Sequence, residues 1–159
     1  MKFIMKTVLT LLSVLTVFTV SARTYSLTSP DGSITVGVNV GDNVTYSVNR
    51  NGHVALENCA IAMETSVATY GVQPKVKSVK TSEHRGVYRP YNHYKTREVA
   101  DNYNELKLTF KDGWSLEFRA YDNGAAYRIV TAAKGRMTVS NETVEYRMPQ
   151  EAQVCLSLE

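Results

Sequence analysis

The chain has 159 residues, 43% of them hydrophobic and 21% charged, with a formal net charge of +3 at pH 7. This length is sufficient for one domain with a sizeable core. The near-neutral charge balance gives no reason to expect nucleic acid or an anionic membrane as a partner, so we set both partner classes aside.

Residues 1–22 have the features of a secretory signal peptide. Lys2 and Lys6 form a basic start. A 14-residue, mostly apolar run from Thr7 to Val20 follows and precedes small residues at the expected signal-peptidase cleavage site. The alternative is a membrane anchor, but a span needs about 20 residues, and no later segment is apolar enough. Arg23 stands where a lipoprotein would have Cys, so we expect no lipid anchor. The expected mature chain, residues 23–159, has a net charge of +1 and is periplasmic or secreted.

The two cysteines, Cys59 and Cys155, both lie in the expected mature chain. In an oxidising compartment they can pair and constrain the unfolded chain by closing a long loop. The alternative is two separate buried thiols that act as small hydrophobic side chains. The spacing matches no motif and leaves both readings open.

Most of the chain alternates apolar and polar residues with a period of two, as half-buried β-strands do. Ile34–Val40 and Val44–Val48 alternate in this way, and Asn51-Gly52 is a strong hairpin signal. Residues 33–58 are therefore predicted to form an antiparallel meander.

The alternation is lost between Ser82 and Asp101, which we interpret as a long loop that is either functional or disordered. It returns at Leu106–Phe110 and, after a turn at Asp112-Gly113, at Trp114–Tyr121. Trp114 is expected in the core or in an interface. Just before the loop, Lys75, Lys77 and Lys80 can be read as a phosphate-binding face, but protection of an edge strand explains them better.

The turn Asp122-Asn123-Gly124 joins two apolar-patterned segments and predicts a tight hairpin with positive φ angles. Phe118 and Ala120 share one face of the first segment, and Tyr127 and Ile129 share one face of the second. Arg119 and Arg128 come near each other in such a hairpin and need acidic partners, for which Glu117 or Asp122 are the candidates.

The last part of the chain is predicted to form two short strands on either side of Asn141-Glu142, after a turn at Lys134-Gly135. A further alternating strand begins at Val154 and is still in progress at Glu159. No segment has a helical period. The predicted fold class is all-β, an antiparallel β-sandwich that we expect to be incomplete.

Candidate ligand-binding residues lie in the long loop. Tyr88, Tyr91 and His93 belong to an aromatic and polar cluster whose rings are suited to stacking on sugars. The alternative is that these tyrosines fasten the loop to the sheet or to another domain, because aromatic clusters mark interfaces of any kind.

Neither a metal site nor a catalytic pair is predicted. His84 and His93 would need a further ligand such as Glu98 or Asp101, and solvated loop histidines are the favoured alternative. Carboxylates suited to glycoside chemistry are present at positions 98, 101, 105, 117 and 142, but none is assigned a catalytic role. Glu117 is expected to be a solvent-facing strand residue.

Several segments occur in the order found in the N-terminal domain of glycoside hydrolase family 97. They are Ser29-Pro30-Asp31-Gly32, Asn102–Leu106, the hairpin Phe118–Arg128, and Asn141-Glu142 followed by Tyr146, Met148 and Pro149. The hairpin is the most distinctive of them. Asn123 and Ala125 differ from the Asp and Val that are more usual there. The chain resembles roughly the first half of that domain.

The resemblance implies a secreted or periplasmic α-glycosidase acting on an α-glucan or an α-galactoside. In that family a β-supersandwich precedes a catalytic (β/α)8 barrel, and Ca²⁺ is held in the active site largely by glutamates. The catalytic residues come from the barrel, and the calcium-binding glutamate of the N-terminal domain lies later than this chain reaches. No catalytic or metal residue is therefore transferred, no cofactor is expected in this chain, and the chain alone is expected to be inactive.

Three hypotheses follow. The first is a non-catalytic N-terminal portion that packs on a catalytic barrel in the same protein. The second is a stand-alone secreted carbohydrate-binding module, which would use the Tyr88–Tyr94 loop. The third is a remnant without a role, because half a sandwich leaves an open sheet edge.

Overall fold

A computed structural model describes residues 22–91 and 96–153. In these ranges the chain forms strands only, with the bounds β1 Arg23–Thr28, β2 Ile34–Val40, β3 Val44–Arg50, β4 His53–Thr65, β5 Thr69–Tyr70, β6 Val76–His84, β7 Val87–Tyr88, β8 Val99–Ala100, β9 Tyr103–Phe110, β10 Trp114–Tyr121, β11 Gly124–Thr131 and β12 Val139–Val144. The predicted signal peptide and the predicted strand from Val154 lie outside the described residues, apart from Ala22.

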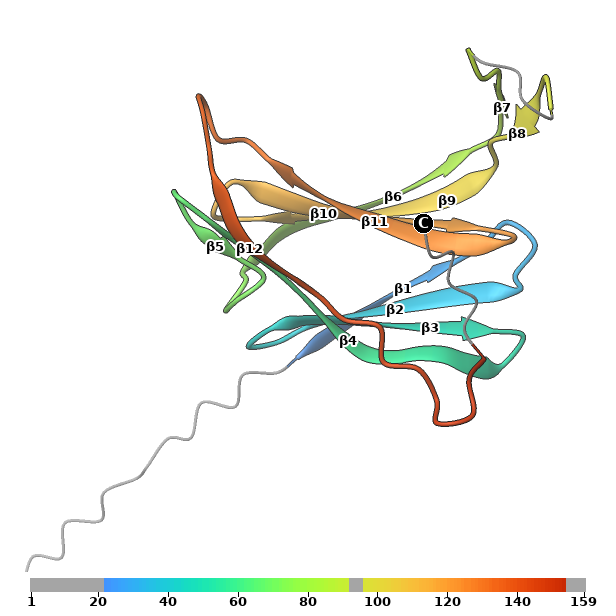
Figure 1. Cartoon of the computed structure of the whole chain (residues 1–159), viewed down its shortest axis with the longest axis horizontal. Helices are drawn as coiled ribbons and strands as arrows, with labels where there is room; N and C mark the ends of the chain where they lie inside the picture. The colour runs from blue at the N-terminus through green and yellow to red at the C-terminus, as the bar shows by residue number, and fades with distance from the viewer. Residues whose placement is uncertain (1–21, 92–95, 154–159) are drawn as a thin grey trace, which may run out of the picture.

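The strands build two antiparallel sheets that stack as the layers of a sandwich (Figure 1). One sheet has the order β1-β2-β3-β4-β12, with β5 paired to β4, and the other has the order β11-β10-β9-β6. The pair β7 and β8 forms a separate small hairpin. The prediction of an all-β antiparallel sandwich is confirmed.

The core lies between the two sheets and follows the alternation in the sequence. In β2 every second residue is buried, from Ile34 to Val40, and β9 buries Leu106, Leu108 and Phe110 in the same way. Aromatic pairs join the layers: the ring centroids of Tyr46 and Phe118 are 5.8 Å apart, and those of Tyr70 and Trp114 are 5.4 Å apart. Trp114 is therefore a core residue, as predicted.

The predicted meander is confirmed, as are the predicted turns at Asn51-Gly52 and Asp112-Gly113. β2, β3 and β4 pair consecutively, and Asn51 and Gly52 both have positive φ, at 50° and 81°, as the preferred two-residue hairpin turn requires. Gly113 takes a φ of 83° in the turn between β9 and β10. β6 is an edge strand, and its Lys77 and Lys80 are exposed. This agrees with the interpretation that the lysines protect an edge strand.

Three local predictions were wrong. The segment from Ser82 is not one long loop, because β6 continues to His84 and residues 87–88 and 99–100 pair. One strand, β12, runs through Asn141-Glu142 instead of two strands flanking it, because it pairs along β4. The turn after Tyr121 is tight, since Tyr121 pairs with Gly124, but none of its residues takes a positive φ.

Cys59 is a buried free thiol on β4. Its Sγ atom accepts a hydrogen bond from the backbone N–H of Arg147 at 3.2 Å and donates one to the carbonyl oxygen of Glu57 at 3.8 Å. Cys155 lies outside the described residues. The burial of Cys59 is that of a small hydrophobic side chain, and the pairing of the two cysteines stays a prediction.

Candidate functional site

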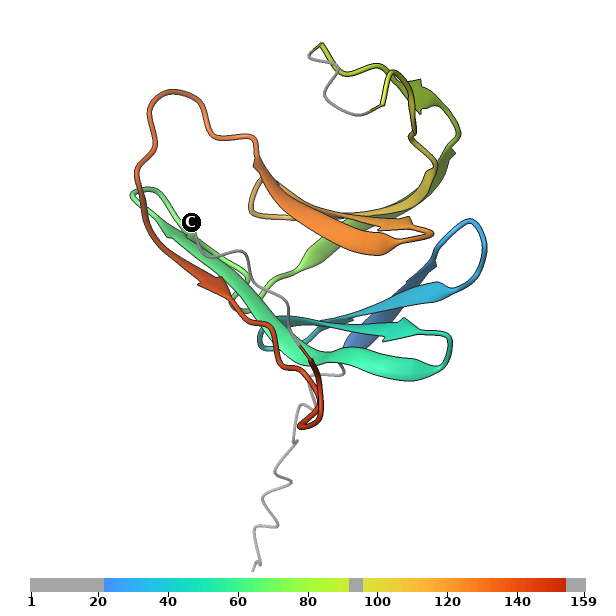
Figure 2. The same cartoon turned by 45° about the vertical axis from the view of Figure 1, so that its right-hand side comes forward.

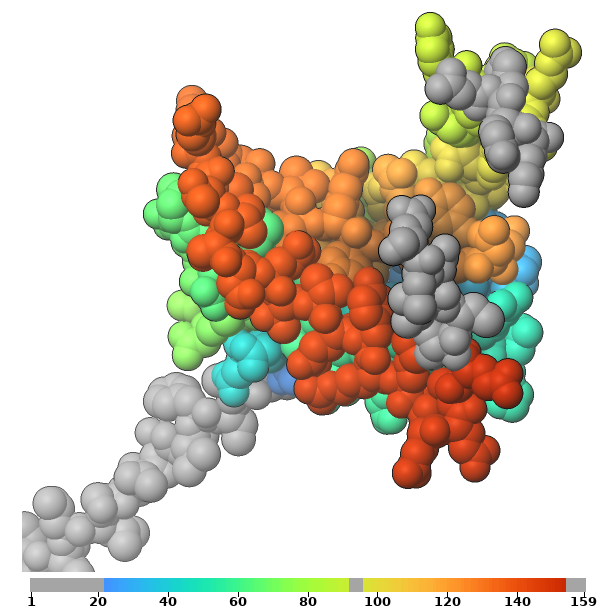
Figure 3. All heavy atoms as spheres, in the orientation of Figure 1, coloured from blue at the N-terminus to red at the C-terminus, as the bar shows by residue number. Residues whose placement is uncertain are grey.

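A hairpin arm, residues 86–101, projects from one end of the four-stranded sheet. β6 and β9 continue past the sandwich and lead into β7 and β8, which stand clear of both layers (Figures 1 and 3). Residues 92–95 of this arm, including the candidate His93, lie outside the described residues. The arm carries the other two candidate binding residues, Tyr88 and Tyr91.

Most described residues of the arm are exposed to solvent. Tyr91 is 97% exposed and Tyr88 is 59% exposed, and Val87 and Val99 are exposed beside them. Large apolar side chains normally find cover in a folded domain, and a cluster of uncovered ones marks an interaction site. Tyr88 and Tyr91 are therefore available for contact with a ligand or with another domain, and both of these interpretations stay predictions.

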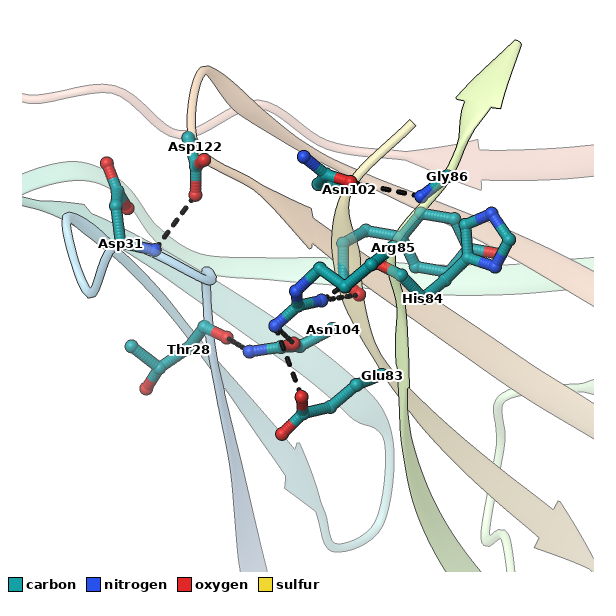
Figure 4. A network of polar contacts seen from close by, with 10 residues as sticks. Thr28, Asp31, Glu83, His84, Arg85, Gly86, Asn102, Asn104 and Asp122 are labelled. Atoms are coloured by element: carbon teal, nitrogen blue, oxygen red, sulfur yellow. Dashed lines mark hydrogen bonds and ion pairs between the residues drawn. The ribbon is translucent and has the colours of Figure 1, made fainter. Parts of the chain in front are cut away.

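Arg85 fixes the base of the arm (Figure 4). Its Nη1 donates to the carbonyl oxygens of His84 and Tyr103 at 2.8 and 2.9 Å. Its Nη2 contacts Oδ1 of Asn104 at 3.0 Å and Oε2 of Glu83 at 3.3 Å. One planar guanidinium thus bridges the ends of β6 and β9, with a geometry that a flexible ammonium would not hold.

Asn102 and Asn104 extend this anchoring in two directions. Oδ1 of Asn102 accepts a hydrogen bond from the N–H of Gly86 at 3.1 Å, which holds the start of the arm. Nδ2 of Asn104 donates to the carbonyl oxygen of Thr28 at 2.7 Å, on the opposite sheet (Figure 4). The base of the arm is therefore tied to both layers.

The turn between β1 and β2 lies at the same end of the sandwich. Its Asp31 N–H donates to Oδ1 of Asp122 at 2.9 Å. Hydrogen bonds from the hydroxyl of Ser29 and from the N–H of Ser33 lower the pKa of Asp31 to about 2. The segment Ser29–Gly32, on which part of the family resemblance rested, is thus a structural turn that links the sheets.

Of the groups considered for metal binding, the structure brings His84 and Asp101 together, whereas Glu98 pairs with an arginine. His84 stacks on Tyr103, with ring centroids 4.9 Å apart, and its Nε2 lies 3.3 Å from Oδ2 of Asp101. Glu98 accepts from Nε and Nη2 of Arg89, at 2.8 and 2.7 Å. Within residues 22–91 and 96–153, no three His, Cys, Asp or Glu side chains gather as a metal site.

The outer face of the four-stranded sheet carries a ladder of ion pairs centred on Glu117. Its carboxylate lies 2.8 Å from Nζ of Lys107 and 2.6 Å from Nε of Arg128. The hydrogen bond from Lys107 lowers the pKa of Glu117, although burial opposes this, and Arg128 adds to the lowering. Glu117 is only 6% exposed, so the expectation of a solvent-facing residue was wrong: flanking strands cover it on both sides.

Arg119 occupies the next rung of the same ladder. Its Nε donates to Oε2 of Glu105 at 2.8 Å, and its guanidinium lies 4.2 Å from the ring centroid of Tyr103. Burial is the largest single influence and lowers the pKa of Arg119, but the hydrogen bond to Glu105 and the further contributions of Tyr121, Tyr103 and the Glu105 charge together outweigh it, so the pKa is raised. Of the two expected partners, Glu117 pairs with Arg128 as predicted, whereas Arg119 uses Glu105.

The sequence placed Tyr88 and Tyr91 on the segment that projects, but it gave no sign of Arg85, Asn102 or Asn104 as its anchors. The segment Asn102–Leu106 contains two of these anchors, but the sequence identified it only as part of a family pattern. Four of the five carboxylates considered for catalysis, at positions 98, 101, 105 and 117, are paired with cationic or imidazole groups. The arrangement is that of a rigid framework that presents an arm.

The described residues contain no helix with the length and apolar character needed to cross a membrane.

Comparison with known proteins places the chain in a family. The family profile described as Glycosyl-hydrolase 97 N-terminal matches residues 27–158. A curated relative, a retaining alpha-galactosidase of Bacteroides thetaiotaomicron, is 33% identical over 131 residues, which cover 81% of this chain and 20% of the relative.

Solved structures support the fold of the described residues. A Glycoside Hydrolase Family 97 enzyme from Pseudoalteromonas sp. strain K8, in complex with panose, superimposes with a TM-score of 0.68 at 22% identity, over 79% of this chain and 20% of the other. A beta-arabinopyranosidase superimposes with a TM-score of 0.71 at 25% identity, over 80% and 22% of the two chains. The chain spans about a fifth of the length of these relatives. It belongs to the family described as Glycosyl-hydrolase 97 N-terminal.

Proposed function

We propose that the chain is the non-catalytic N-terminal β-sandwich of an exported, calcium-dependent α-glycosidase that acts on α-glucosides or α-galactosides. The observation that carries the proposal is the family match over residues 27–158, which spans nearly all of the described sandwich, together with a coverage of only about a fifth of the relatives. One relative is named for retaining alpha-galactosidase activity. The signal-like residues 1–22 support export.

The described residues support a framework role rather than a catalytic one. Glycoside hydrolysis needs two carboxyl groups at a set separation, one of them with a raised pKa, whereas the shifted carboxyl groups here, Asp31, Glu117 and Glu145, all have lowered pKa values. The described carboxylates also do not fit a Ca²⁺ ion, because they are paired with cations or apart from one another. Calcium would therefore be held by other residues of the intact enzyme.

The arm gives this framework a means of contacting the catalytic domain. Its base is tied to both sheets through Arg85 and Asn104, and its tip presents Tyr88 and Tyr91 without cover. An apolar projection on a rigid base is suited to packing against a neighbouring domain in the same chain.

The test is to express the reading frame that continues past the codon of Glu159 and to compare its product with residues 1–159 alone. The longer product should hydrolyse p-nitrophenyl α-glucoside or α-galactoside and lose this activity in EDTA, with recovery in Ca²⁺. Residues 1–159 should be inactive. A stop codon at that point, or a longer product inactive on both substrates, would refute the proposal.

A second candidate is a stand-alone glycan-binding module, which the full exposure of Tyr91 favours. The same material tests it. Residues 1–159 would then be retarded in gels that contain an α-glucan or an α-galactoside, and Tyr91→Ala would abolish the retardation while Tyr25→Ala would not. Equal mobility with and without the polysaccharide excludes this function.

A further inference from the structure

A cleft of about 600 Å³ lies between the two sheets beside β11 and β12. Two further hollows lie at the other end of the molecule, toward which β6 and β9 extend from the arm (Figure 2). One of them, of about 500 Å³, opens on the outer face of the four-stranded sheet. The other, of about 240 Å³, lies between β6 and the first strands of the opposite sheet. The two hollows adjoin, because Lys111 lines both.

The walls of these two hollows, which together we name the basic strip, are strongly cationic. Among the described residues that line them there is no carboxylate, but there are five cations, Arg23, Lys75, Lys77, Lys107 and Lys111. The whole chain, in contrast, has 18 Lys and Arg against 15 Asp and Glu. A surface on which one sign of charge gathers attracts the opposite sign, so the basic strip is suited to an anion.

Protection of the edge strand β6 does not account for all of these lysines. Lys107 and Lys111 stand on and just after β9, which is an inner strand. Lys107 also lies directly opposite Lys80 of β6, and like charges in register are unfavourable in a sheet. The ion pair of Lys107 with Glu117 relieves this only in part, because Arg128 shares the same carboxylate. The outer face therefore keeps an excess of positive charge.

An irregularity of β6 places Lys77 in the strip. Between Val76 and Ser78 the register against β9 shifts by one residue, which leaves Lys77 as an extra residue on β6. Such β-bulges re-aim a side chain and are common beside functional sites. Here Lys77 lines the same hollow as Lys107 and Lys111. Among the described residues, neither Lys77 nor Lys111 takes part in an ion pair.

We propose that the basic strip binds an acidic glycan through carboxylate or sulfate groups on its sugars. The larger hollow, of about 500 Å³, has a volume typical of small-molecule sites, which range from about 300 to 1,000 Å³. Besides its lysines it is lined by three residues with hydroxyl side chains, Thr109, Ser115 and Thr131. Hydroxyl groups both donate and accept hydrogen bonds, as sugar hydroxyls require. Lysine binds an anion as a point charge, so the strip accepts a carboxylate or a sulfate.

The strip lacks the aromatic platform of a site for single-stranded nucleic acid. Such sites stack bases on accessible aromatic rings. Among the described residues that line the strip, the aromatic ones are Phe110 and Trp114, and both are buried in the core. The proposal goes beyond the function proposed above and does not rely on it, because the strip lies away from the arm and needs no catalytic residue.

Isothermal titration calorimetry of the full 159-residue chain tests the proposal. The acidic probes are a galacturonate hexasaccharide and a heparin-derived hexasaccharide, and the neutral control is maltohexaose. One variant removes two charges from the strip, Lys77→Gln with Lys111→Gln. The matched variant removes two exposed charges outside it, Arg50→Gln with Arg97→Gln.

We expect at least one acidic probe to bind and maltohexaose not to bind, and the better probe identifies the anionic group. The strip variant should lose at least about tenfold in affinity, because two charge-assisted contacts are removed. The matched variant should change by less than about twofold, because distant exposed charges are screened.

Failure of both acidic probes to bind, or an equal loss of affinity in the two variants, would overturn the proposal. Inorganic sulfate that binds as tightly as the better hexasaccharide would mean an adventitious ion only. Tighter binding of a single-stranded oligonucleotide would assign the strip to nucleic acid, and both of these results also overturn the proposal.

Nuclear magnetic resonance of the unmodified chain decides the matter if the strip variant fails to fold. The better probe should shift the amide resonances of Lys77 and Lys111 and leave that of Arg97 in place, and the reverse pattern refutes the proposal. None of these outcomes depends on the enzymatic activity of a longer protein, so a failure here is distinct from a failure of the function proposed above.

Discussion

At the scale of single residues, Glu117 shows how a polar face becomes part of the stabilising structure. Lys107 and Arg128 stand on the strands at either side of it, in register, so that one buried carboxylate is shared by two cations. A buried charge is tolerated only when it is paired and hydrogen-bonded, and here both conditions hold.

Replacing this carboxylate should destabilise the protein in a pH-dependent manner. Glu117→Gln should lower the free energy of unfolding at pH 7 by about 1–3 kcal/mol, because two cations lose their partner. Since the pKa of Glu117 is lowered on folding, its stabilisation is present above the ordinary pKa of 4.5 and is lost as the pH falls through the folded value. The difference from the unmodified chain should therefore shrink below about pH 4.5.

Urea unfolding, followed by the fluorescence of Trp114 at several pH values, measures both effects. Glu98→Gln is the matched control, because its ion pair with Arg89 is solvent-exposed and should contribute less than about 1 kcal/mol. A deficit of Glu117→Gln that stays constant from pH 7 to pH 3 would contradict the proposed role of its charge.

At the scale of elements, the arm is a local structure with its own anchor. Its pairing comprises two short strands, which alone would be marginal in water. The contacts of Arg85 and Asn102 at its base therefore decide how well it is ordered, whereas the sandwich core lies elsewhere.

Removing the anchor should loosen the arm without unfolding the sandwich. In Arg85→Met we expect chymotrypsin to cleave after Tyr88 or Tyr91 at least about threefold faster, because local opening becomes easier while global stability is little changed. Arg89→Met is the control, since Arg89 pairs with Glu98 within the arm and does not contact the base. Cleavage that accelerates equally in both variants would show that Arg85 is not the anchor.

At the scale of the whole molecule, both sheets share one core, and Trp114 reports on their contact. It stacks on Phe110 of its own sheet with a centroid distance of 4.0 Å and contacts Tyr70 of the opposite sheet. We expect its fluorescence and the far-ultraviolet circular dichroism to change in a single coincident transition in urea. Separate midpoints for the two signals would mean that the sheets can part before their strands unfold.

Local physics in the sequence determined the strands and most turns. The period-two alternation of Ile34–Val40 identifies a half-buried strand without reference to any partner, and Asn51-Gly52 selects its turn through backbone conformation alone. The same local information placed Trp114 in the core and the aromatic side chains Tyr88 and Tyr91 on a segment without regular alternation.

Only the tertiary structure decided which residues meet across the sheets. The burial of Glu117 depends on the register of three strands. The anchoring by Arg85 depends on the ends of β6 and β9 lying side by side. The cleft between the two sheets depends on β11 and β12 being the edge strands there. These pairings join residues distant in sequence, and a shift of one position would reverse every face. The alternation of apolar and polar residues determines that a strand has an apolar face. Only the packing of the strands determines which residues that face contacts.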